Sequence, residues 1–183
     1  MFGHSNEPIK LARDVKAIII PAGEELTLRE GTPGCITQAL GGSFTIFVEG
    51  NLFRIAGADA DALGKEPTPP PSVPDNPSDK DIEDVIWQQL KTCYDPEIPV
   101  NIVDLGLIYR CNVQALGNGE RSVDVDMTLT APGCGMGDVL VADARDKIAA
   151  VPTVSDVRVE LVFDPPWNQS MMSEEARLQT GLM

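Results

Sequence analysis

Histidine and closely paired cysteines are almost absent from this chain. The single histidine is His4, near the N-terminus, and the four cysteines are Cys35, Cys93, Cys111 and Cys134. No two of them have the C-x-x-C spacing typical of zinc and dithiol sites. A multi-histidine metal centre and a Cys–His hydrolase are therefore excluded. The four thiols are also too few for a disulfide scaffold, which indicates reduced cysteines in a reducing compartment.

Basic residues and long apolar runs are scarce as well. The chain has 14 Lys and Arg against 28 Asp and Glu, for a formal net charge of −14 at pH 7. This balance argues against binding to a nucleic-acid backbone, which needs clustered Lys and Arg. No apolar run reaches the length of a membrane span, and the N-terminus lacks the basic region and apolar stretch of a signal peptide. We expect a cytoplasmic protein with neither nucleic-acid nor membrane partners.

Proline is concentrated in one stretch. Residues 65–78 read KEPTPPPSVPDNPS, and so many prolines rule out a helix or a paired strand there. The stretch is expected to be a semi-rigid linker. It divides the chain into an N-terminal unit, 1–64, and a C-terminal unit, 79–183, both within the size range of small domains.

The two units have different patterns. The N-terminal unit predicts short strands separated by glycine turns, at 15–20, 35–40, 43–48 and 52–55, which makes it a small, mostly β unit. The C-terminal unit predicts a helix from residue 79 capped by Ser78 and Asp81, strands at 107–115 and 122–130, a helix at 138–149, a strand at 154–163 and a last helix after Ser173. The order αββαβα indicates a two-layer α+β sandwich.

One cysteine lies in a glycine-rich loop between a predicted strand and a predicted helix. The loop reads APGCGMG, with Cys134 between Gly133 and Gly135. A thiol near a helix N-terminus ionises more easily, because the helix dipole favours an anion there. The flanking glycines permit close approach of another group. A thiolate in such a loop can bind a metal, attack an electrophile or exchange with a disulfide.

Three separated motifs resemble one known family. YDPEIPVNIVDLGLIY, MTLTAPGCGMGD and VFDPPWNQSMMSEEARLQTG occur in this order, as in the metal–sulfur cluster assembly factors. That family includes small bacterial proteins, the phenylacetate-oxygenase assembly subunit and the eukaryotic cytosolic iron–sulfur targeting subunit. The resemblance covers about residues 79–181, and TQALGGSFTIFVEGNLFRIAGADADALG resembles the N-terminal extension of the family's long form. It implies a non-enzymatic role in maturing iron–sulfur proteins, with Cys134 as the functional thiol.

Four further residues are candidates to line a site at Cys134. Asp95 and Glu97 flank Pro96, and either end the first helix in a turn or supply a carboxylate as hard ligand or proton acceptor. Asp104 either fixes its loop or lines the site. Thr130 is placed to bond to the cysteine loop, although a threonine at a strand end is common. No catalytic residue is assigned.

Trp167 and the other cysteines have competing interpretations. Trp167, in a rigid DPPW segment, either anchors a partner surface or packs against its own domain. Cys93 and Cys111 are expected to be core residues, and Cys35 has no assigned role.

The residues leave three functions open. The first is an assembly factor that holds a labile iron–sulfur cluster and passes it from assembly proteins to client apoproteins. A cluster needs about four thiolate-type ligands, so one loop must be supplemented by a second protomer of a homodimer, a partner, a small thiol or carboxylates. The second is a metal-free adaptor that recognises clients through the Trp167 region and the N-terminal unit. The third is a thiol oxidoreductase, which needs Cys111 or Cys93 close to Cys134.

Overall fold

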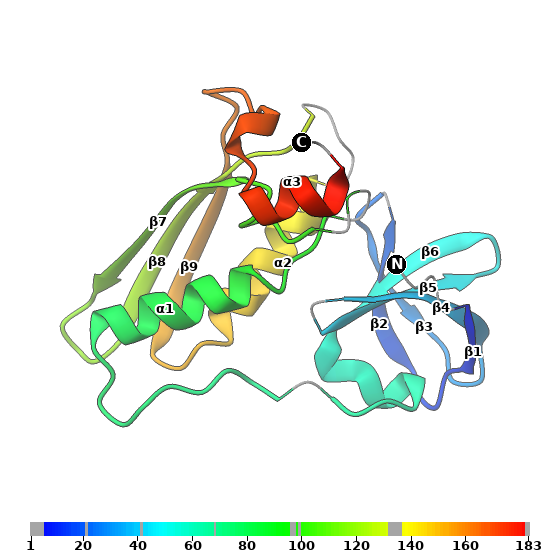
Figure 1. The fold of residues 1–183 in the computed structure, drawn as a ribbon. Helices are drawn as coiled ribbons and strands as arrows, with labels where there is room; N and C mark the ends of the chain where they lie inside the picture. The colour runs from blue at the N-terminus through cyan, green and yellow to red at the C-terminus, as the bar shows by residue number, and fades with distance from the viewer. Residues whose placement is uncertain are drawn as a thin grey trace. The chain divides into compact units, whose positions relative to one another are not determined.

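The computed structural model describes residues 6–20, 22–40, 42–67, 69–95, 98, 100–131 and 137–181. The chain forms two compact units, Met1–Pro69 and Pro70–Met183 (Figure 1). The division falls inside the stretch predicted as a linker, whose described residues form neither helix nor strand. Independent folding of the two units stays a prediction.

The N-terminal unit is a six-stranded antiparallel sheet followed by a short 3-10 helix. Its elements are β1 Glu7–Lys10, β2 Val15–Ile20, β3 Glu25–Leu28, β4 Pro33–Leu40, β5 Ser43–Val48, β6 Asn51–Ile55 and η1 Gly57–Leu63. The strand order is β1-β4-β5-β6-β2-β3. The inward residues of the strands, among them Ile36, Ile46 and Ile55, are at most 1% exposed and form the core. Burial of alternate residues is what the period-2 pattern predicts.

The C-terminal unit has the predicted order αββαβα. Its elements are α1 Asp79–Leu90, β7 Ile108–Ala115, β8 Arg121–Met127, α2 Gly137–Ala149, β9 Val154–Leu161, the short helix η2 Gln169–Met171 and α3 Glu174–Thr180. The sheet order is β7-β8-β9, with β7 antiparallel and β9 parallel to β8. Helices α1 and α2 pack side by side against the sheet (Figure 1), and both contribute to one core with β8. The predicted α+β fold is confirmed.

The ends of two helices follow the sequence signals closely. The Ser78 hydroxyl accepts from the Asp81 N–H at 3.1 Å, and the Asp81 carboxylate accepts from the Ser78 N–H at 2.8 Å. The bond from the Ser78 N–H, with a second bond from the Ser78 hydroxyl at 2.8 Å, lowers the pKa of the Asp81 carboxyl. At the other end of the unit, the Ser173 hydroxyl accepts from the Ala176 N–H, and Gly181 closes α3 in a left-handed conformation. Each cap satisfies backbone groups that a helix end leaves unpaired.

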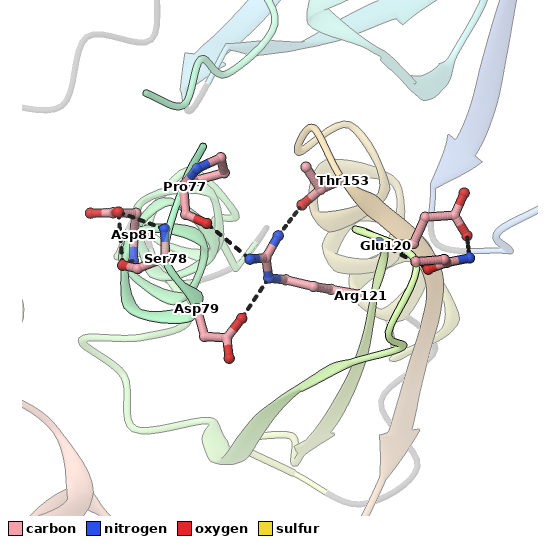
Figure 2. A network of polar contacts seen from close by, with 8 residues as sticks. Pro77, Ser78, Asp79, Asp81, Glu120, Arg121 and Thr153 are labelled. Carbon is pink, nitrogen blue, oxygen red and sulfur yellow. Dashed lines mark hydrogen bonds and ion pairs between the residues drawn. The ribbon is translucent and has the colours of Figure 1, made fainter. Parts of the chain in front are cut away.

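Arg121 joins three segments near the start of α1 (Figure 2). Its side chain, 11% exposed, donates to the Asp79 carboxylate at 2.8 Å, the Thr153 hydroxyl at 2.8 Å and the Pro77 carbonyl at 3.0 Å. It thereby ties the start of α1 to the turn before β9. A planar guanidinium can satisfy several acceptors at once, which the single ammonium of lysine cannot do with the same geometry.

Replacing Arg121 with alanine is expected to lower the free energy of unfolding by about 2–3 kcal/mol, because the Pro77 and Thr153 contacts are lost from a nearly buried position. Asp79→Ala removes one partner that is 63% exposed, so a loss below about 1 kcal/mol is expected. Urea unfolding of both variants measures the difference. Equal losses would contradict the assignment of the stabilisation to the two uncharged partners.

Candidate functional site

The segment that carries Cys134 lies between a buried strand end and a closely packed helix start. After β8, Thr128 is 1% exposed and Leu129 is 5% exposed. A Cβ atom on Gly137, the first residue of α2, would lie 2.9 Å from Leu129 Cδ1 and 3.3 Å from Leu161 Cδ1. The first turn of α2 therefore packs directly on Leu129, just after β8, and on Leu161 at the end of β9, and a methyl group at position 137 would displace the Leu129 side chain.

Four of the predicted site residues lie outside the described residues. These are Glu97, Gly133, Cys134 and Gly135. The described flanks nevertheless fix where the segment begins and ends: Ala131 follows the β8 strand and Gly137 opens a helix of 13 residues. The N-terminus of such a helix favours an anion. The reactivity of Cys134 stays a prediction on this basis.

A line of backbone hydrogen bonds connects this strand end to two neighbouring segments. The Thr128 N–H donates to the Leu107 carbonyl at 2.8 Å, and the Leu107 N–H donates to the Ile102 carbonyl at 3.0 Å. The Ile102 N–H then donates to the Cys93 carbonyl at 2.8 Å. The structure thus places the segments of three predicted site residues, Thr130, Asp104 and Asp95, next to one another in turn.

Asp95 is a buried carboxylate that organises its own turn. It is 7% exposed, and its Oδ1 accepts from the Ile98 N–H at 3.0 Å. The Asp95 N–H donates to the Val100 carbonyl at 3.3 Å. These bonds are what the turn interpretation predicts. A role for Asp95 as ligand or proton acceptor stays a prediction.

Asp104 fixes the next turn. Its carboxylate accepts from the Asn101 side-chain amide at 2.6 Å, and its N–H donates to the Asn101 Oδ1 at 2.9 Å. Its carbonyl accepts from the Ser173 N–H at 2.8 Å, which holds the start of α3. The described contacts of Asp104 are those of a loop-fixing residue, and no described contact carries its predicted role in lining a site.

The residues between β9 and α3 form a closing segment, 164–173, that lies on the 104–109 segment. The Trp167 indole N–H donates to the Leu105 carbonyl at 2.7 Å, and the Tyr109 hydroxyl donates to the Pro165 carbonyl at 2.7 Å. In Figure 1 this part of the chain, orange to red, lies at the end of the sheet where β8 stops. Trp167 is therefore half-buried against its own unit. Its role as a partner anchor stays a prediction.

Sequence reasoning missed three residues of this end. Gly106 has φ +76°, and a Cβ there would lie 2.3 Å from the Met171 carbonyl oxygen. Tyr109 and Thr128 lie within the predicted strands 107–115 and 122–130, and the sequence indicated no role for either residue. The glycine in the DLG motif was the one signal for a left-handed turn. Nothing in the sequence indicates which tyrosine or threonine reaches a distant segment.

The described residues do not supply a metal site by themselves. Within those residues, no three His, Cys, Asp or Glu side chains are grouped so as to hold a metal ion. The predicted ligand, Cys134, is outside that part of the chain. Cys134 alone cannot complete the ligand set of a cluster, which needs about four ligands.

The described thiols are reduced and differ from a reactive cysteine. Cys35, Cys93 and Cys111 are free thiols. Cys93 is fully buried and its Sγ lies 3.8 Å from the Gln89 carbonyl oxygen. Burial, with a smaller contribution from the negative charge of Glu83, raises the pKa of the Cys111 thiol to about 11. The environment of Cys111 is therefore not that of a thiolate nucleophile at neutral pH.

Cys111 is expected to resist alkylation in the folded protein. A pKa of about 11, against an ordinary 9.0, lowers its thiolate fraction at pH 8 about a hundredfold relative to an exposed thiol. Because the unfolded chain ionises this thiol first, its contribution to stability is complete below pH 9 and is lost as the pH rises through 11. Iodoacetamide labelling against pH, read by peptide mapping, measures the rates. Faster labelling of Cys111 than of Cys134 at pH 7 would contradict the prediction.

In comparisons with known proteins, the chain is similar to proteins named for iron–sulfur cluster assembly and maturation. The sequence profile of a family described as iron–sulfur cluster assembly protein matches residues 83–161. A protein of Porphyromonas gingivalis, named Fe-S protein maturation auxiliary factor, is 50% identical over 101 residues, which are 55% of this chain and 92% of that protein. The Fe-S protein maturation auxiliary factor SufT of Staphylococcus aureus is 40% identical over 88 residues, 48% of this chain and 96% of that protein.

A solved structure matches as well. The crystal structure of a domain of unknown function from Bacillus anthracis has a TM-score of 0.50 and 33% identity, and the match covers 57% of this chain and 96% of that chain. These relatives are matched over nearly their whole length, yet over only about half of this chain. This chain therefore carries a long stretch that they lack.

Of the helices that the structure describes, none has the length and apolar character to cross a bilayer.

Proposed function

Because this chain belongs to the family of iron–sulfur cluster assembly proteins, we propose that it is a non-enzymatic maturation factor that takes up an iron–sulfur cluster through Cys134 and delivers it to client apoproteins. The family predicted from the three motifs is confirmed by the profile match and by relatives that include SufT. Those relatives are named for the maturation of iron–sulfur proteins. The role in maturation follows from this membership, and the role of Cys134 rests on the site.

One observation carries the assignment of Cys134: its segment joins the end of β8 to the start of α2, at the same end of the unit as Asp95 and Asp104. Leu129 and Leu161 pack on Gly137 and hold this junction together. A thiolate next to a helix N-terminus is stabilised as an anion. A thiolate is also the ligand that iron in clusters prefers.

The chain's own residues would act as a temporary ligand set. The Cys134 thiolate binds an iron of the cargo, and Asp95 and Glu97 are the candidates that the sequence motif offers for a carboxylate ligand or proton acceptor. Transfer is a ligand exchange: the bond from iron to the Cys134 sulfur breaks as a bond from iron to a client thiolate forms, without change of oxidation state. An incomplete ligand set makes this exchange fast, because the remaining positions are filled by a second protomer, a small thiol or the client.

A metal-free adaptor is the second candidate. It is favoured by the closing segment, in which Trp167 is only half-buried and Pro165, Pro166 and Asn168 are exposed. In that function the closing segment and the N-terminal unit would recognise the client, and Cys134 would contact a cluster held by another carrier. The two candidates make opposite predictions for iron content.

Anaerobic reconstitution with iron and sulfide tests the proposal. The wild type is expected to gain iron, acid-labile sulfide and the visible absorption of a cluster, and Cys134→Ala is expected to gain none of them. Cys35→Ala is the control, since its thiol lies on β4 of the other unit. A wild type that binds a client apoprotein but never retains iron would leave the adaptor as the function. Equal iron in the wild type and Cys134→Ala would remove Cys134 from the site.

A further inference from the structure

Thr128 carries a buried hydroxyl group just after the end of β8. The residue is 1% exposed, and its Oγ1 has no hydrogen-bond partner in the part of the chain that the structure describes. Its backbone N–H has a partner, since it donates to the Leu107 carbonyl at 2.8 Å. A buried hydroxyl without a partner lowers stability, because it has lost its hydrogen bonds to water and has formed none within the protein.

The surroundings of Thr128 favour an apolar side chain. On the neighbouring strands it lies between Leu107, which is fully buried, and Val162, whose N–H donates to the Met127 carbonyl at 2.8 Å. Valine has the shape of threonine without the hydroxyl, so it would fill the same space and leave no polar atom unpaired. Packing alone therefore gives no reason for a hydroxyl at this position.

The position of Thr128 relates it to the cargo site. It directly follows Met127, the last residue of β8, and lies two residues before Thr130 in the sequence. Both threonines precede the segment with Cys134, and Thr128 is bonded to the same line of segments that includes the Asp95 turn. A hydroxyl at this position that has no hydrogen-bond partner among the described residues is suited to form a hydrogen bond when the cluster binds.

We propose that Thr128 is a positioning residue for the cargo: its hydroxyl, which has no acceptor among the described residues, donates a hydrogen bond to a sulfur of the iron–sulfur cluster once the cluster is bound. This inference rests on the proposed function. Hydrogen bonds to cluster sulfurs stabilise the negative charge that they carry. The bond forms only in the loaded protein, so it favours loading and slows release.

The test compares Thr128→Val with Thr128→Ser in the full chain. Thr128→Val is expected to keep or raise the melting temperature of the empty protein, because it removes an unpaired hydroxyl. After reconstitution it is expected to lose its cluster to a chelator about tenfold faster than the wild type, the equivalent of one hydrogen bond to a charged group. Thr128→Ser keeps the donor and is expected to release the cluster at a rate close to that of the wild type.

Thr92→Val is the matched control for stability. The Thr92 hydroxyl donates to the Gln89 carbonyl at 2.6 Å, so the same change there is expected to lower the melting temperature. A comparable drop in Thr128→Val would overturn the inference, because it would mean that the hydroxyl already has a partner, such as an internal water. Release at the wild-type rate from Thr128→Val would also overturn it. These failures differ from a failure of the proposed function, in which neither the wild type nor Cys134→Ala retains iron.

Discussion

Cells that carry Cys134→Ala in place of the wild-type protein are expected to lose the support of iron–sulfur enzyme maturation, while the purified variant melts within a few degrees of the wild type. The expected loss of function is complete, because no other described side chain offers a thiolate at this end of the unit. Serine is expected to fail in the same way, since a hydroxyl is a poor ligand for soft metals at neutral pH.

The small effect on stability has a structural reason. The contacts that hold the strand end to the helix start come from Leu129, Leu161 and Gly137, and replacement of Cys134 leaves these in place. A substitution outside such contacts changes stability by about 1 kcal/mol or less.

Two measurements at equal expression check the prediction: a thermal melt of the purified variant, and the activity of an aconitase-type enzyme in cells that lack the wild-type protein. Cys111→Ala is the control, because its thiol is partly buried in β7 and has a raised pKa. It is expected to keep full maturation. Full rescue by Cys134→Ala would remove this thiol from the mechanism and favour the adaptor. A collapsed melting transition would instead make Cys134 a packing residue.

Local signals in the sequence predicted much of the fold, because they act over a few residues. Ser78 and Asp81 form the predicted capping box, and the alternation in 122–130 predicted a strand with its inner residues buried. The sequence did not indicate β1 and β3. Both have only four residues and lie at the edges of the sheet, so they lack the length over which alternation becomes visible.

The candidate site was less predictable, because its contacts join residues far apart in the sequence. The position of Cys134 between a strand and a helix followed from local patterns. The hydrogen bonds from Trp167 to Leu105 and from Tyr109 to Pro165 depend on how the closing segment folds back. The hydrophobic periodicity of the sequence does not predict this path. The sequence also did not indicate that the Thr128 hydroxyl has no partner among the described residues, because the sequence alone does not distinguish a buried threonine from an exposed one at a strand end.

Gly106→Ala is expected to be the most destabilising of the single substitutions considered. Gly106 has φ +76°, a conformation that strains any residue with a Cβ. The new methyl group would also lie 2.3 Å from the Met171 carbonyl oxygen and 2.8 Å from the carbonyl carbon. These are backbone atoms, so the closing segment must move away as a whole. The bond between Ser173 and Asp104 would be lost with it.

The expected loss is about 3–5 kcal/mol in the free energy of unfolding, as the sum of strain, clash and broken hydrogen bonds. Gly117→Ala is the matched control: Gly117 has φ +83°, but nothing lies within 4 Å of its Cβ position. The control therefore measures the strain alone, about 1 kcal/mol. Urea unfolding of both variants isolates the contact between Gly106 and Met171. Equal losses would show that the closing segment is not held at Gly106, and that the bonds of Trp167, Tyr109 and Ser173 hold it instead.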